Sequence, residues 1–242
     1  MDHTFIPRKD NFISPINFVQ PHIENFIALS NNRIMKNILC FGDSNTYGYN
    51  PETGGRYTKN ERWSGILKKL LGVEYNVIED GRCSRTILFK DPNDISTCGI
   101  NYLPYCLLKN KPIDLVIIAL GLNDFQSAYN ASVDDVIDGV KVLCDLVKNY
   151  DVSKILLTAP AYIQNGISNG SFGCLFDERS VTKSVKLAVK LKDFSINNDC
   201  FFFDFNSVAK TSAKDCLHMD TFAHKQIAHA LSKIIPNILI MC

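Results

Sequence analysis

Short apolar runs that alternate with helical patterns constrain the fold of this chain more than any other feature. The run at residues 113–120 is almost entirely apolar and is followed by a glycine. A strand of this kind is buried on both faces, which is typical of the centre of a parallel sheet. Helical patterns separate it from further apolar runs on either side. This alternation predicts parallel strands whose right-handed crossover helices cover both faces of the sheet.

The same periodicity predicts five strands and four long helices from residue 36 onward. The strands are expected at residues 36–41, 75–79, 113–120, 154–159 and 199–204. The helices are expected at residues 61–71, 134–150, 180–197 and 221–235. Gly72 is expected to end the first helix, Asp220 to cap the start of the last, and Pro236 to end it. The sequence therefore predicts a flavodoxin-like three-layer α/β/α sandwich with about five parallel strands.

The chain divides into an N-terminal extension, residues 1–34, and one predicted domain, residues 35–242. No repeat or low-complexity linker interrupts the second part. The extension lacks the basic start and continuous apolar core of a secretory signal. Three interpretations of it stay open: a packed extension, a disordered arm, or an upstream stretch that the functional domain does not require.

Charge and cysteine content limit the classes of partner. The 26 basic side chains nearly balance the 25 acidic ones, which argues against a nucleic-acid partner and against a polybasic membrane patch. No stretch approaches the roughly 20 apolar residues of a membrane-spanning helix. The nine cysteines include no pair with the two-residue gap of a zinc or redox motif, and three of them, Cys40, Cys144 and Cys200, lie in apolar runs. We expect reduced thiols, a cytoplasmic protein and a small-molecule substrate.

A serine, a histidine and a carboxylate stand at positions where catalytic groups gather. Ser44 follows the first predicted strand, and Asp215 and His218 lie three residues apart near the C-terminus. The imidazole can take the serine proton, while the carboxylate holds the imidazole in the right tautomer. Taken singly, Ser44 also fits a turn cap and His218 a surface histidine beside a helix start. Their joint occurrence favours a serine hydrolase.

Asn123 supplies a further hydrogen-bond donor at the end of the apolar run 113–120. A side-chain amide there can stabilise the oxyanion that forms when an ester carbonyl is attacked. The alternative for Asn123 and Asp124 is a simple Asx-turn after a buried strand. No Gly-x-Ser-x-Gly motif surrounds Ser44, so the nucleophile elbow of the α/β-hydrolases is excluded.

Four segments resemble, in order, the sequence blocks of the GDSL, or SGNH, hydrolase family. They are residues 41–44 (FGDS), 81–86 (GRCSRT), 121–124 (GLND) and 215–218 (DCLH). The likeness covers residues 35 to about 235 and is greatest to the arylesterase and acyltransferase branch. It implies the SGNH hydrolase fold, with Ser44 as nucleophile and Asp215 and His218 completing the triad.

The resemblance also implies an oxyanion hole made by the backbone N–H groups of Ser44 and Ser84 and the side chain of Asn123. Many family members have glycine at the position of Ser84, but the backbone donor is retained. Arg85 is expected to organise that loop. The name-giving motif has leucine where this chain has Asn45. That position need not touch the substrate, so the change has little expected effect.

Substrate contacts are expected from two places. Tyr47 occupies a position where this branch tends to have an aromatic residue near the serine. The loop at residues 161–179 carries Phe172 and Phe176, which are predicted to form one wall of the acyl or alcohol pocket. The alternative is that this loop covers a sheet edge or packs against another subunit.

The resulting hypothesis is a serine esterase that cleaves short-chain aryl or alkyl carboxylic esters through an acyl-enzyme, with acyl transfer where an alcohol replaces water. It predicts no cofactor and no metal, and the resemblance favours a homo-oligomer. Three alternatives stay open. One is a carbohydrate O-deacetylase of the same family, and another is a non-catalytic flavodoxin-like module that binds a phosphate or nucleotide. The third is a catalytically inactive member of the family, although every triad position is filled.

Overall fold

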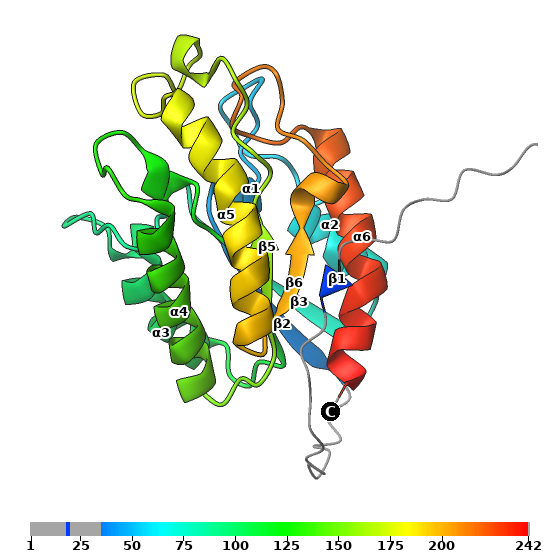
Figure 1. The fold of residues 1–242 in the computed structure, drawn as a ribbon. Helices are drawn as coiled ribbons and strands as arrows, with labels where there is room; N and C mark the ends of the chain where they lie inside the picture. The colour runs from blue at the N-terminus through cyan, green and yellow to red at the C-terminus, as the bar shows by residue number, and fades with distance from the viewer. Residues whose placement is uncertain (1–17, 20–34, 242) are drawn as a thin grey trace, which may run out of the picture.

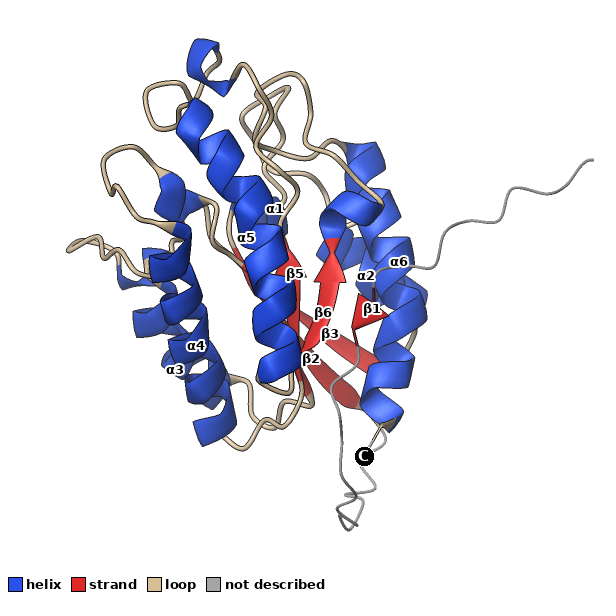
Figure 2. Ribbon diagram, in the orientation of Figure 1, coloured by secondary structure: helices blue, strands red, loops and turns tan. Residues whose placement is uncertain are grey.

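A computed structural model describes residues 18–19 and 35–241 of the chain, and its centre is a six-stranded sheet (Figures 1 and 2). The strand order is β1-β6-β5-β4-β2-β3. Strands β2 to β6 are mutually parallel, and the two-residue β1 pairs antiparallel with β6. Their bounds are Phe18–Val19 (β1), Lys36–Gly42 (β2), Tyr75–Gly81 (β3), Leu115–Ala119 (β4), Ile155–Ala159 (β5) and Phe201–Asp204 (β6).

Helices cover both faces of the sheet, as the alternating pattern predicted. Helices α3, α4 and α5 lie on one side, and α2 and α6 lie on the other (Figure 1). Their bounds are Ser44–Tyr47 (α1), Trp63–Leu71 (α2), Gly99–Lys109 (α3), Val133–Asn149 (α4), Glu178–Asn197 (α5) and Thr221–Ile240 (α6). The three-layer α/β/α fold is confirmed. None of the helices in the described ranges is long and apolar enough to cross a membrane.

The two layers of core follow from the alternation of side chains along the strands. Val116 and Ile118 of β4 face the α3–α4–α5 layer, while Leu115 and Ile117 face α2 and α6. All four are buried, which explains why this strand reads as a continuous apolar run. The cysteines predicted to be in the core, Cys40, Cys144 and Cys200, are buried too.

Helix ends agree with the predicted capping residues except at one proline. Gly72 ends α2 with a φ of +81°, and Asp220 caps α6 by accepting a hydrogen bond from the Ala223 N–H at 2.8 Å. Helix α6 nevertheless runs through Pro236 to Ile240, so the predicted end at residue 235 is wrong. The buried residues beyond the proline, Ile238 and Leu239, belong to the core. Their burial offsets the helix hydrogen bond that proline cannot make.

Helix α3 was not predicted, because Gly99 and Pro104 obscure its pattern. Both residues lie inside the helix. The helix forms because Leu103 and Leu107 pack into the core against the sheet and α4. Tertiary packing outweighs local propensity at this element.

The parallel register places three loops side by side. Gly42, the last residue of β2, pairs with Gly81 of β3 and with Ala119 of β4. The loops that follow these strands therefore start together at the carboxyl end of the sheet, where open α/β sheets bind their ligands. Figure 2 shows the loops gathered at the end to which the β6 arrow points.

Candidate active site

Three side chains from two distant segments form one hydrogen-bonded line. His218 Nε2 lies 2.9 Å from Ser44 Oγ, and His218 Nδ1 lies 2.7 Å from Asp215 Oδ2. The exposed fractions are 7% for Ser44 and 3% each for Asp215 and His218. Because the carboxylate accepts from Nδ1–H, Nε2 is left to accept the serine proton.

The segment from Asp215 to His218 is held by the same carboxylate. Asp215 Oδ1 accepts the backbone N–H groups of Leu217 at 3.0 Å and His218 at 2.9 Å. Cys216 takes a φ of +61° within this turn. Burial disfavours the charged form of Asp215 and by itself would raise its pKa. The hydrogen bond and the electrostatic attraction to His218 outweigh this effect, so the pKa of Asp215 is lowered. Asp215 is therefore a carboxylate at neutral pH.

Ser44 is presented by a sharp turn between β2 and the short helix α1. Asp43 caps α1 by accepting the Asn45 N–H at 2.9 Å. A Cβ atom at Gly42 would overlap with Thr46 Oγ1 and approach the Ala119 carbonyl, so only glycine fits there. Burial raises the pKa of Asp43 to about 6, although its hydrogen bond to Asn45 N–H and nearby positive charge pull the pKa down.

Arg85 ties the loop after β3 to the loop that carries Ser44. Its guanidinium donates to the carbonyls of Gly42 at 3.0 Å, Asp80 at 2.7 Å and Ser96 at 2.8 Å, and to Asp80 Oδ1 at 2.8 Å. The preceding residue, Ser84, has a φ of +62°. Arg85 thus organises the loop of Ser84 as predicted. The left-handed conformation at Ser84 is one that glycine adopts without steric cost.

Asn123 and Asp124 bond to the backbone of this same loop, and Asn123 Oδ1 also accepts the Gln126 side-chain amide at 3.4 Å. The Asn123 amide donates to the Arg85 carbonyl at 3.1 Å. Asp124 accepts the N–H of Ile87 at 2.8 Å and of Leu88 at 3.0 Å. Burial raises the pKa of Asp124 to about 7 against the effect of these hydrogen bonds. The Asx-turn alternative does not describe these side chains, because the backbone groups to which they bond lie 36 to 38 residues away.

Of the three predicted substrate contacts, only Phe172 lies against the histidine. Its ring centroid is 5.0 Å from that of His218. Tyr47 instead carries the Arg56 guanidinium over its ring at 4.2 Å. Phe176 is 1% exposed and packs in a small core cluster with Leu217. Its expected place in the pocket wall needs correction, because a buried Phe176 has almost no surface for a ligand.

Tyr49 is an aromatic neighbour of the site that the sequence analysis missed. Its ring centroid lies 4.2 Å from that of His218, with the two planes at 37°. It also meets Phe172 edge-on at 6.0 Å. The sequence offered one signal, because Tyr49 is a second aromatic residue two positions after Tyr47. It directly follows Gly48, which has a left-handed φ of +84° in the structure.

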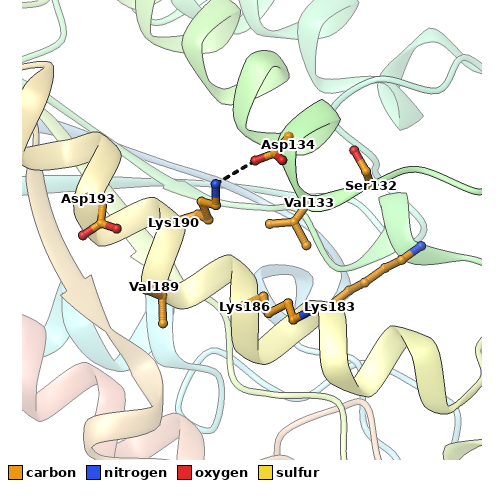
Figure 3. Close-up of a pocket in the computed structure, with 8 residues that line it drawn as sticks. All are labelled: Ser132, Val133, Asp134, Lys183, Lys186, Val189, Lys190 and Asp193. Atoms are coloured by element: carbon orange, nitrogen blue, oxygen red, sulfur yellow. Dashed lines mark ion pairs between the residues drawn. The ribbon is translucent and has the colours of Figure 1, made fainter.

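A pocket of about 540 Å³ lies away from these residues, between the start of α4 and the outer side of α5 (Figure 3). Its charged side chains are partly paired, since Lys190 Nζ lies 3.0 Å from Asp134 Oδ1. None of the candidate catalytic residues lines it. The lining residues are Ser132, Val133, Asp134, Lys183, Lys186, Val189, Lys190 and Asp193.

A serine hydroxyl, an imidazole and a carboxylate in one line, at the carboxyl end of a parallel α/β/α sheet, define the class of serine hydrolases. The sequence model of the GDSL-like Lipase/Acylhydrolase family matches residues 38–231, and the chain belongs to this family. It is accordingly a carboxylic ester hydrolase.

Solved structures of esterases are similar over nearly their whole length. The native aryl esterase of M. smegmatis is 32% identical with a TM-score of 0.77, covering 84% of this chain and 99% of that one. A carbohydrate acetylesterase family member from Sinorhizobium meliloti is 30% identical with a TM-score of 0.79, covering 86% and 100%. Est24, a carbohydrate acetylesterase from the same organism, is 29% identical with a TM-score of 0.79, covering 84% and 99%. No curated protein matches the chain significantly.

Proposed function

We propose that this protein hydrolyses short-chain aryl or alkyl carboxylic esters with Ser44 as the nucleophile. The observation that carries the proposal is the line from Ser44 Oγ through His218 to Asp215, with contacts of 2.9 and 2.7 Å. Ser44 Oγ attacks the acyl carbon while His218 Nε2 takes its proton, and Asp215 stabilises the imidazolium. His218 then protonates the departing alcohol. Water, activated by the same histidine, releases the acid from Ser44.

The oxyanion of the tetrahedral intermediate is assigned to three donors. These are the backbone N–H groups of Ser44 and Ser84 and the side-chain amide of Asn123. One N–H of that amide donates to the Arg85 carbonyl, which leaves the other for the oxyanion. Each such donor contributes about 2.7–4 kcal/mol to transition-state stabilisation.

The proposed mechanism is tested with p-nitrophenyl acetate and butyrate. For Ser44→Ala and His218→Ala, kcat is expected to fall by at least about a thousandfold, because each removes a group that acts in the transition state. A phosphonyl fluoride should label the wild type and leave Ser44→Ala unlabelled. If both variants keep wild-type turnover, the assignment of these residues is wrong.

A carbohydrate O-deacetylase is the second candidate, because two similar structures are carbohydrate acetylesterases. Comparing kcat/KM for p-nitrophenyl acetate with that for acetylated sugars separates the two functions. A preference for the sugar ester by orders of magnitude would favour the deacetylase. Adding an alcohol and measuring ester formation tests acyl transfer, in which the alcohol replaces water at the acyl-enzyme.

A cytoplasmic location and a homo-oligomer complete the proposal. The buried thiols Cys40, Cys98 and Cys106 are free, which suits a reducing compartment. Light scattering coupled to gel filtration would measure the oligomeric state, and fractionation of cells would test the location.

A further inference from the structure

Asn45 is the residue at which this chain departs from the name-giving family motif. It directly follows Ser44 and is the second residue of α1. Its side chain is buried, with an exposed fraction of 8%. A buried amide without partners would cost free energy, so its hydrogen bonds show what it does.

The Asn45 amide bonds to the backbone on both sides of His218. Its Nδ2 donates to the Leu217 carbonyl at 3.3 Å. Its Oδ1 accepts the Met219 N–H at 3.0 Å. One partner is an acceptor and the other a donor, so the orientation of the amide follows from them. Leucine, the residue of the family motif, could make neither bond.

The backbone of His218 also makes two hydrogen bonds within its own segment of the chain. Its N–H donates to Asp215 Oδ1 at 2.9 Å, and its carbonyl accepts the Ser212 N–H at 2.7 Å. These two bonds stay within one segment of the chain. The two Asn45 bonds instead cross 172 and 174 residues to reach the same turn. They join the loop of the nucleophile to the loop of the base.

We propose that Asn45 is a positioning residue that holds the His218 turn at hydrogen-bonding distance from Ser44 Oγ. The inference rests on the proposed roles of Ser44 and His218 in ester hydrolysis. Ser44 and Asn45 are adjacent in α1. The hydrogen bonds of the Asn45 side chain to the His218 turn therefore also set the distance between Ser44 and His218. A displacement of about 1 Å between reacting groups can lower the rate about a hundredfold.

The first test restores leucine at this position. Asn45→Leu leaves the Leu217 carbonyl and the Met219 N–H without these partners, so kcat for p-nitrophenyl acetate is expected to fall about a hundredfold with KM little changed. The rate of labelling of Ser44 by a phosphonyl fluoride should fall in parallel. In that reaction the serine oxygen displaces fluoride at phosphorus and its proton goes to His218.

Asn37→Leu is the matched control. Asn37 lies at the other end of β2, where its amide donates to the Pro112 carbonyl at 2.6 Å. The same substitution there removes two side-chain hydrogen bonds between segments, one to Pro112 and one from Asn76, without touching the site. We expect a lower unfolding midpoint with wild-type kcat. Equal losses of kcat in Asn45→Leu and Asn37→Leu, or a wild-type kcat in Asn45→Leu, would overturn the proposal.

Asn45→Asp provides a test that does not depend on the leucine variant folding. A protonated carboxyl can donate to the Leu217 carbonyl and accept the Met219 N–H, whereas a carboxylate can only accept. The ratio of kcat in Asn45→Asp to wild-type kcat should therefore rise as the pH falls. The titratable side chains of Asp43, Asp215 and His218 lie nearby in both proteins, so the comparison uses the ratio to wild type at each pH. A ratio that is constant with pH contradicts the proposal.

Failure of this inference is distinguishable from failure of the proposed function. If Ser44→Ala and His218→Ala are inactive while Asn45→Leu keeps full kcat, only the role of Asn45 is wrong. If Ser44→Ala keeps wild-type turnover, the assignment of the nucleophile is wrong.

Discussion

Single residues in unusual conformations occur in two of the turns that form the proposed site. Ser84 and Cys216 are non-glycine residues with φ values of +62° and +61°. Such conformations cost of order 1 kcal/mol each and persist where surrounding contacts hold them. Arg85 holds the first turn through four donated hydrogen bonds, and Asp215 holds the second. The geometry of the site is therefore imposed by buried polar contacts rather than by local preference.

Asp124 is expected to make stability depend on pH. Its pKa is raised to about 7 in the folded protein, mainly by burial, against about 3.9 in an unfolded chain. Between these values the folded protein binds more protons than the unfolded chain, so the contribution of Asp124 to stability falls as the pH rises. The loss amounts to at most about 4 kcal/mol.

The measurement is the free energy of unfolding in urea from pH 4.5 to 7.5 for wild type and Asp124→Asn. Asparagine cannot titrate, so wild-type stability minus variant stability should decrease with rising pH. Asp138→Asn, on an exposed position of α4, controls for the loss of one carboxylate. A difference that increases over this range would contradict the prediction.

At the scale of elements, the N-cap of the core helix α6 lies next to the histidine segment of the site. Asp220 accepts the Ala223 N–H at 2.8 Å and lies two residues after His218. Asp220→Ala should lower the free energy of unfolding by about 1 kcal/mol, because one N–H of the first turn loses its partner. It should also lower kcat severalfold, since fraying of that turn reaches the histidine segment.

Ser132→Ala is the comparison for this cap. Ser132 is the N-cap of α4 and accepts the Asp135 N–H at 3.1 Å, in a capping box far along the chain from His218. We expect a similar loss of stability, about 1 kcal/mol, with unchanged kcat. Urea unfolding and p-nitrophenyl acetate turnover measure both effects. Equal kcat in the two variants would show that the α6 cap does not influence the site.

At the scale of the whole molecule, we propose that residues 35–242 form an independent domain. Both layers of core lie between β2 and α6, and the family match begins at residue 38. The predicted extension, residues 1–34, lies outside the described residues except for Phe18–Val19. That short strand β1 pairs with Phe202 and Phe203 at the edge of β6.

A chain of residues 35–242 should therefore fold and keep its kcat/KM for p-nitrophenyl acetate. Without β1, backbone groups at the outer edge of β6 lose their partners and can form strand pairs with another copy of the chain. Light scattering should show self-association that increases with concentration, compared with the full chain. Loss of activity in dilute solution would contradict the independent domain.

The sequence by itself determined the layers and the candidate residues. The continuous apolar run of β4 and the period of 3.6 along α4 depend only on neighbours in the chain, so these elements were predictable. Ser44 and His218 were recognisable because a strand end and an Asp-x-x-His turn are local patterns. Their distance of 2.9 Å across 174 residues was not, because no local pattern encodes it.

Only the tertiary structure decided how the loops meet. Helix α6 continues through Pro236, because the burial of Ile238 and Leu239 offsets the helix hydrogen bond that the proline cannot make. The tertiary structure also placed Tyr49 against His218 and the Asn45 amide across the His218 turn. Contacts between distant segments depend on the packing of the entire sheet, and packing free energy outweighs the preferences that a short stretch of sequence expresses.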